Sequence, residues 1–111
     1  MSWQALALEQ AMRALRAGGA PAAQRIAQDL IRRDPRCADG WFFLARLAQQ
    51  SNHILKARGL AETALRVAPD STRYLAFHAF LLAICQEYPD ALALVDALET
   101  RTDKEIGRAH V

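Results

Sequence analysis

Hydrophobic residues recur at three- and four-residue spacing along most of this chain, as they do in helices that bury one face. Short breaks interrupt the pattern and divide it into segments of helical length. The pattern predicts six helices, over residues 3–17, 21–33, 39–51, 54–67, 71–86 and 89–100. The sequence therefore predicts an all-α protein.

Residues that commonly end or begin helices occupy the predicted breaks. Gly18 tolerates the positive φ angle found after a helix, and Asn52 can do so at the equivalent turn. Pro21 suits the first turn of a helix, where its missing N–H has no partner to lose. Asp39 and Ser71 are expected to act as N-caps.

A period of 34 residues relates the predicted helix pairs to one another. Pro35 and Pro69 lie one period apart, in DPRCADGW (34–41) and APDSTRYL (68–75). The same offset relates Ala11, Ala45 and Ala79; Ala23, Ala57 and Ala91; Ala27, Ala61 and Val95; and Leu30, Ala64 and Leu98. The sequence thus predicts three repeats, at about 4–37, 38–71 and 72–105.

The middle repeat resembles the tetratricopeptide repeat (TPR) family, as found in bacterial proteins. The matching residues are Trp41, Leu44, Ala45, Ala57, Ala61, Ala64 and Pro69. The chain departs from the family pattern at Ala48, Gln10, His78 and Asp103, so the outer repeats match fewer positions. The resemblance implies a right-handed solenoid of three helix-turn-helix repeats in one TPR domain over residues 1–105.

Small residues at the repeated positions let the two helices of a unit approach closely. Trp41, at a position where the family has Trp, is expected to pack in the core beside them.

The resemblance also implies a concave groove lined by the first helix of each repeat. We predict that Phe42 faces a ligand there and that Phe43 packs toward a neighbouring helix. The predicted partner-binding residues are Leu8, Met12, Phe42, Arg46, Gln49, Arg73 and Phe80. Arg16 and Asp39 fall on the same groove-facing positions.

This groove suits an extended or helical peptide with apolar anchors and some acidic character. TPR domains that hold the acidic C-termini of chaperones use Lys and Asn on their inner helices. This chain has Arg46 and Arg73 and none of the Asn, which argues against that ligand class. Alternatively, an adjacent element of the chain or a second copy covers these residues.

Composition and charge exclude several other classes. The 111 residues are 52% hydrophobic, and 14 Lys and Arg oppose 12 Asp and Glu, so a formal charge of +2 gives no argument for nucleic acid. Cys37 and Cys85 form no CxxC pair, and His78, at a core position, is expected to be structural. We predict no catalytic residue, no metal and no cofactor. Without a signal peptide or a spanning apolar run, we predict a cytoplasmic protein that does not bind membranes.

The end of the chain carries a separate expectation. Residues 106–111, IGRAHV, are what the sequencing-adapter string ATCGGAAGAGCACACGTC encodes, which indicates a non-native tail. The predicted helix at 89–100 is apolar like an interior helix, whereas a terminal repeat needs a polar outer face. We therefore expect an N-terminal fragment of a longer protein, or self-association through that uncapped helix.

The leading functional hypothesis is a scaffold or adaptor for protein–protein recognition, with no enzymatic activity of its own. One alternative is the N-terminal array of a larger enzyme, since the Ala-, Leu- and Arg-rich style is similar to that of bacterial TPR-containing sulfotransferases. Another alternative is a small TPR chaperone of a bacterial secretion system.

Overall fold

The computed structural model describes residues 2–85 and Ala97. Within these residues the chain is helical and contains no strand. Five helices follow one another: α1 (Trp3–Arg16), α2 (Ala20–Arg33), α3 (Ala38–Gln50), α4 (Ile54–Val67) and α5 (Thr72–Ile84). The prediction of six helices in three repeats is matched only as far as α5. The sixth helix, predicted over 89–100, lies outside the described residues except for Ala97.

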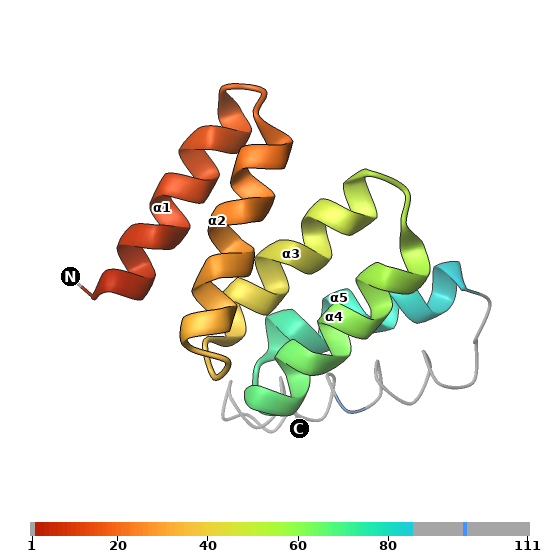
Figure 1. Cartoon of the computed structure of the whole chain (residues 1–111). Coiled ribbons are helices and arrows are strands. Elements are labelled where there is room, and N and C mark those ends of the chain that lie inside the picture. Colours follow the sequence, from red (N-terminus) through yellow and green to blue (C-terminus); the bar gives the residue numbers. More distant parts are fainter. Residues whose placement is uncertain (1, 86–96, 98–111) are drawn as a thin grey trace, which may run out of the picture.

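Each helix packs against the next one in the sequence, from α1 to α5. Figure 1 shows α1 and α2 as one hairpin and α3 and α4 as a second hairpin beside it. The described part of the chain is therefore a stack of helix hairpins, the arrangement that the repeat predicts.

The two helix-to-helix turns within the hairpins are built alike, one period apart. Gly18 and Asn52 have φ angles of +84° and +65°. The residue after each donates a backbone hydrogen bond of 2.8 Å to a carbonyl in the last turn, Gly19 N–H to Ala14 O and His53 N–H to Ala48 O. The positive φ angle turns the chain back, so that the following N–H groups bond to carbonyl groups that the helix end leaves without a partner. The sequence prediction for Gly18 and Asn52 is confirmed.

Of the two N-caps predicted from the sequence, one is found in the structure and the other is not. The Ser71 hydroxyl accepts a hydrogen bond from Tyr74 N–H at 3.2 Å, as an N-cap does. Asp39 was expected to cap the third helix, but α3 begins one residue earlier and Cys37 is its N-cap. Asp39 instead lies in the first turn, where a negative charge also complements the helix dipole.

The repeated small residues form the contacts between helices. Ala11, Ala23, Ala27, Ala45 and Ala57 are completely buried. Ala45 and Ala57 belong to a cluster that also contains Leu81 of α5. Their small side chains bring the helix backbones close together, as the 34-residue period predicted.

Trp41 is half-buried and packs against a second cluster, formed by Phe42, Ala64 and Tyr74. Its indole N–H donates a 2.8 Å hydrogen bond to the carbonyl of Pro35. A partly buried indole needs an acceptor for its N–H. The hydrogen bond of Trp41 therefore links the start of α3 to the turn before it.

Gly40 of α3 lies close against α2. A Cβ atom there would lie 2.7 Å from Ile31 Cγ2 and 3.2 Å from Leu30 Cδ2. We expect Gly40→Ala to lower the free energy of unfolding by about 1 kcal/mol, because overpacking outweighs the gain in helix propensity. Urea denaturation followed by circular dichroism measures the difference.

Gly59 in α4 supplies the matched control, since a Cβ there would have no neighbour within 4 Å. Gly59→Ala is expected to raise the free energy of unfolding by about 0.5–1 kcal/mol through helix propensity alone. Equal stabilisation by both substitutions would contradict the close contact at Gly40.

Candidate functional site

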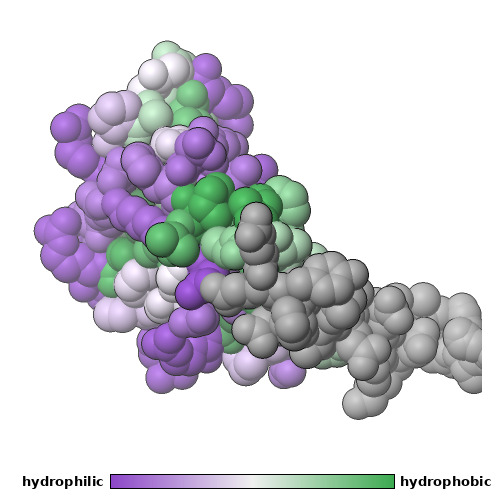
Figure 2. All heavy atoms as spheres, turned by 90° about the vertical axis from the view of Figure 1, so that its right-hand side faces the viewer, coloured by the Kyte–Doolittle hydropathy of each residue, from purple (hydrophilic) through white to green (hydrophobic). Residues whose placement is uncertain are grey.

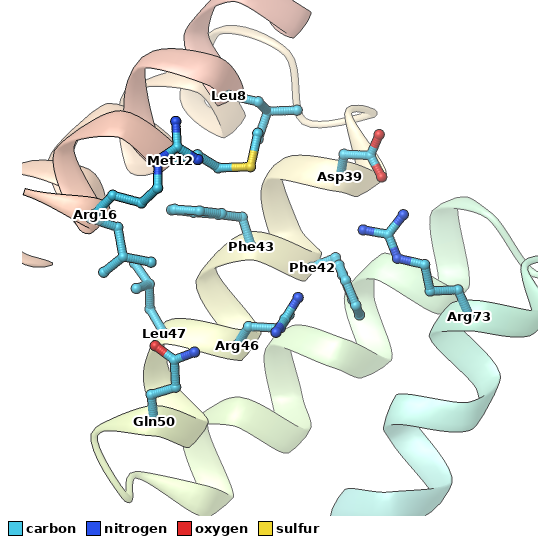
Figure 3. A pocket seen from close by; sticks show the side chains of 11 residues that line it. Leu8, Met12, Arg16, Asp39, Phe42, Phe43, Arg46, Leu47, Gln50 and Arg73 are labelled. Atoms are coloured by element: carbon cyan, nitrogen blue, oxygen red, sulfur yellow. The ribbon is translucent and has the colours of Figure 1, made fainter.

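A pocket with a volume of about 360 Å³ opens between the first helices of successive hairpins. Helix α1 forms one wall, α3 forms the base, and the start of α5 contributes the opposite edge (Figure 3). The lining residues are Leu8, Met12, Leu15, Arg16, Asp39, Phe42, Phe43, Arg46, Leu47, Gln50 and Arg73.

Apolar side chains of α1 and α3 make up the part of the pocket nearest α1. Phe43 and Leu47 lie one turn apart on α3, and Figure 3 shows Phe43 directed toward Met12 and Arg16 of α1. Met12 keeps 43% of its surface exposed. An exposed methionine beside an aromatic ring gives an adaptable apolar surface, which suits contact with another molecule.

Phe42 is buried rather than ligand-facing. Only 6% of its surface is exposed, and its ring centroid lies 4.8 Å from that of Tyr74 and 5.3 Å from that of Phe77. Position 42 faces the aromatic rings of α5, whereas position 43 lines the pocket beside the α1 residues. Both rings line the pocket, and Phe42, expected to face a ligand, is the more buried of the two, whereas Phe43 is the more exposed.

Two arginines lie against the remaining exposed part of Phe42. The Cζ atom of Arg73 is 4.6 Å from the centre of the ring, and that of Arg46 is 6.0 Å away. Such cation–π contacts hold a guanidinium group in place while its N–H edges stay available to a ligand. The third arginine of the pocket, Arg16, comes from the last turn of α1.

Asp39 is the acidic residue of the pocket, and Tyr74 of α5 forms a hydrogen bond with it. The Tyr74 hydroxyl donates a hydrogen bond to Asp39 Oδ1. Burial of the phenol raises the pKa of Tyr74, and the bond to Asp39 adds to the shift. The phenol therefore stays protonated and remains the donor near neutral pH.

Five of the seven predicted binding residues line this pocket: Leu8, Met12, Phe42, Arg46 and Arg73. Gln49 does not line the pocket, but the next residue, Gln50, does. Sequence reasoning missed Leu15 on α1 and Phe43, Leu47 and Gln50 on α3. Each of the three on α3 follows a groove-facing position, 42, 46 or 49, by one residue.

Phe80 lies on α5 away from this pocket and is 50% exposed. Its ring centroid is 6.3 Å from that of Phe77, which in turn contacts Phe42, so aromatic rings continue from the pocket along α5. Ile84, farther along the same helix, is 43% exposed. Figure 2 shows hydrophobic atoms gathered in the middle of one face, with hydrophilic atoms above and to the left of them.

His78 is buried between α4 and α5, with 7% of its surface exposed. Within the described residues neither ring nitrogen has a hydrogen-bond partner, and the nearest carboxylate oxygen, from Glu62, is 3.9 Å from Nε2. Burial lowers the pKa of His78, and Arg58 lowers it further, while Glu62 acts in the opposite direction. This agrees with the structural role predicted for the residue.

A pH dependence follows from the lowered pKa of His78. In the unfolded chain His78 binds a proton near pH 6.5, whereas in the folded chain it stays neutral there. The contribution of neutral His78 to the free energy of unfolding is therefore fully present above pH 6.5. It is lost as the pH falls from 6.5 toward the lower pKa of the folded state. We expect His78→Leu to remove this part of the pH dependence. The slope of the free energy of unfolding with pH should become smaller by up to about 1.4 kcal/mol per pH unit. Urea denaturation between pH 7.5 and 5 would measure it, and an unchanged slope in the variant would contradict it.

The described residues hold no group of three or more His, Cys, Asp or Glu side chains placed to bind a metal ion. Among them there is also no helix with both the length and the apolar character needed to cross a membrane. Cys37 and Cys85 are both free thiols, and burial raises the pKa of Cys37.

No protein-family model matches the chain, and no curated protein matches its sequence. Solved structures do match. The chain is similar to the TPR2B domain of yeast Sti1, in a complex with pHsp70, with a TM-score of 0.81 and 22% identity over 93% of this chain and 83% of that one. It is also similar to MamA, with a TM-score of 0.80 and 14% identity over 97% of this chain and 60% of MamA.

A further likeness is to a chain of the CopN–Scc3 complex, with a TM-score of 0.77 and 11% identity over 88% of this chain and 58% of that one. The chain thus spans less than two thirds of the matched CopN–Scc3 and MamA chains. Likeness at these identities shows the fold alone, and that fold is a TPR-like helical solenoid.

Proposed function

We propose that this chain is a protein-interaction module, and that the pocket between α1, α3 and α5 binds an apolar side chain from a peptide segment of a partner. The observation that carries the proposal is the apolar lining of that pocket, centred on Phe43, in a TPR-like fold. Its volume of about 360 Å³ falls in the range of about 300–1,000 Å³ that ligand pockets occupy.

Two further observations support a peptide as the occupant. Leu8, Met12 and Phe43 give the pocket an apolar lining, and Phe80, farther along α5 and joined to the pocket by the ring contacts of Phe77 and Phe42, is 50% exposed. Structures with the same fold include a TPR domain in complex with pHsp70. We propose that a segment anchored at Phe43 runs along α3 and α5 and contacts Gln49 and Phe80. No reaction is assigned to the chain.

A phage library of random dodecamers, selected on the purified protein, supplies ligands for the test. Phe43→Ala is expected to weaken a selected peptide by roughly 30-fold, because loss of a central aromatic anchor costs about 2 kcal/mol. Fluorescence anisotropy of the labelled peptide measures the change.

Leu55→Ala is the matched control, since Leu55 is 73% exposed on α4 and lies outside this pocket. It should leave the affinity unchanged. Selection of no peptide, or unchanged binding by Phe43→Ala, would contradict the proposal. Light scattering of the free protein distinguishes a further outcome, in which a second copy occupies the pocket.

A further inference from the structure

Three arginines, one from each inner helix, surround the apolar opening of the pocket. Arg16 comes from α1, Arg46 from α3 and Arg73 from α5, and all three side chains are exposed. Among residues 2–85 none of them forms an ion pair. By contrast, Arg13, Arg32, Arg33 and Arg66 each pair with a carboxylate one turn away.

The difference begins in the sequence. Neither Arg16 nor Arg46 has Asp or Glu three or four residues away on its own helix, so no pair within one helix can form. Asp39, the acidic residue that lines the pocket, already accepts a hydrogen bond from Tyr74. The three arginines and Asp39 leave the pocket with a formal charge of +2.

Two of these positive charges, on Arg46 and Arg73, lie near the same aromatic ring. Both guanidinium groups approach the ring of Phe42, at 6.0 and 4.6 Å from its centre, and Figure 3 shows them directed toward it from opposite sides. Two like charges near one ring repel each other, and an anion bound beside them offsets that repulsion. A stacked guanidinium is already ordered, so less entropy is lost when its free N–H edge binds a carboxylate.

We infer that the pocket selects an internal acidic segment, in which one apolar side chain enters beside Phe43 and at least two carboxylate side chains bind the surrounding arginines. This inference rests on the proposed function and names the class of peptide. The charge of +2 matches two carboxylates. Because the arginines surround the opening rather than gather on one side, acidic side chains on both sides of the anchor fit better than a single chain end (Figure 3).

The test uses the same dodecamer library, displayed within a protein loop so that no peptide has a free C-terminus. We expect the selected sequences to combine an apolar residue with two or more Asp or Glu residues. Each selected peptide is then synthesised with an amidated end, beside a version in which Asn and Gln replace Asp and Glu.

The acidic peptide is expected to bind about tenfold more tightly than its neutral version at low salt, because exposed charge pairs contribute modestly each. At about 1 M salt, where the Debye length is about 3 Å, the two affinities should become nearly equal. Selected peptides that are neutral or basic, and that bind independently of salt, would overturn the inference.

Variants assign the charge effect to particular residues. Arg46→Gln with Arg73→Gln should weaken the acidic peptide about five- to tenfold and leave the neutral peptide within about twofold. Arg32→Gln with Arg36→Gln removes the same charge from exposed positions outside the pocket, and should leave both peptides nearly unchanged.

The two proposals fail in different ways. If Phe43→Ala weakens binding as expected but the acidic and neutral peptides bind equally at low salt, the pocket is a peptide site and only the charge selectivity is wrong. If both pairs of arginine substitutions weaken the acidic peptide equally, the effect comes from net charge and the inference is overturned. If no peptide is selected, both proposals fail.

Discussion

Phe42→Ala lowers the free energy of unfolding by about 3–5 kcal/mol, the usual cost of removing a buried aromatic ring. Phe42 is 6% exposed and contacts the rings of both Tyr74 and Phe77, so its loss leaves a cavity between α3 and α5. Small domains have about 5–15 kcal/mol of stability in total, so the variant should be close to unfolding at room temperature. Urea denaturation monitored by circular dichroism measures the loss.

Phe43→Ala is the matched control, since it removes the same side chain from the next position on the same helix. Phe43 is only half-buried and faces the pocket, so we expect a loss of about 1 kcal/mol. A loss at position 43 as large as that at position 42 would contradict the difference in burial between the two residues.

Ala57→Phe lowers the free energy of unfolding by about 3 kcal/mol, the upper end of the usual cost of overpacking. Ala57 is completely buried on α4 and shares a cluster with Ala45 of α3 and Leu81 of α5. A benzyl group there would push α3 and α4 apart. The midpoint of thermal unfolding, followed by circular dichroism, should fall accordingly.

Ala76→Phe on α5 makes the same change at an exposed position. Its effect should stay within about 0.5 kcal/mol, as is usual for surface substitutions. If both variants were equally stable, the small residues that recur at the 34-residue period would not be needed for close packing of the helices.

The sequence predicts the helices well because their signals are local. Gly18 and Asn52 end helices through their own backbone preference, and Ser71 caps a helix with its own hydroxyl. The boundaries of α4 coincide with the predicted range 54–67. The prediction of Asp39 as the N-cap was wrong because a sequence pattern locates a helix start only to within one or two residues. A shift of that size decides which residue is the N-cap.

The site was harder to predict because it depends on how helices face one another. Residues 42 and 43 are both aromatic, and helical periodicity places them about 100° apart without saying which faces α5. Only the packing of α3 between α1 and α5 shows that Phe43, Leu47 and Gln50 line the pocket. The hydrogen bond between Tyr74 and Asp39 joins α5 to α3, 35 residues apart in the sequence, so no local pattern could have shown it.

The most direct test of the proposed binding site is a titration of the methyl-labelled protein with a selected peptide, followed by NMR. We predict that the methyl signals of Leu8, Met12 and Leu47, which line the pocket, shift and saturate together with the peptide. Leu55 on α4, outside the pocket, should not respond. Shifts at Leu55 with unchanged signals from Leu8, Met12 and Leu47 would place the binding surface elsewhere and contradict this account.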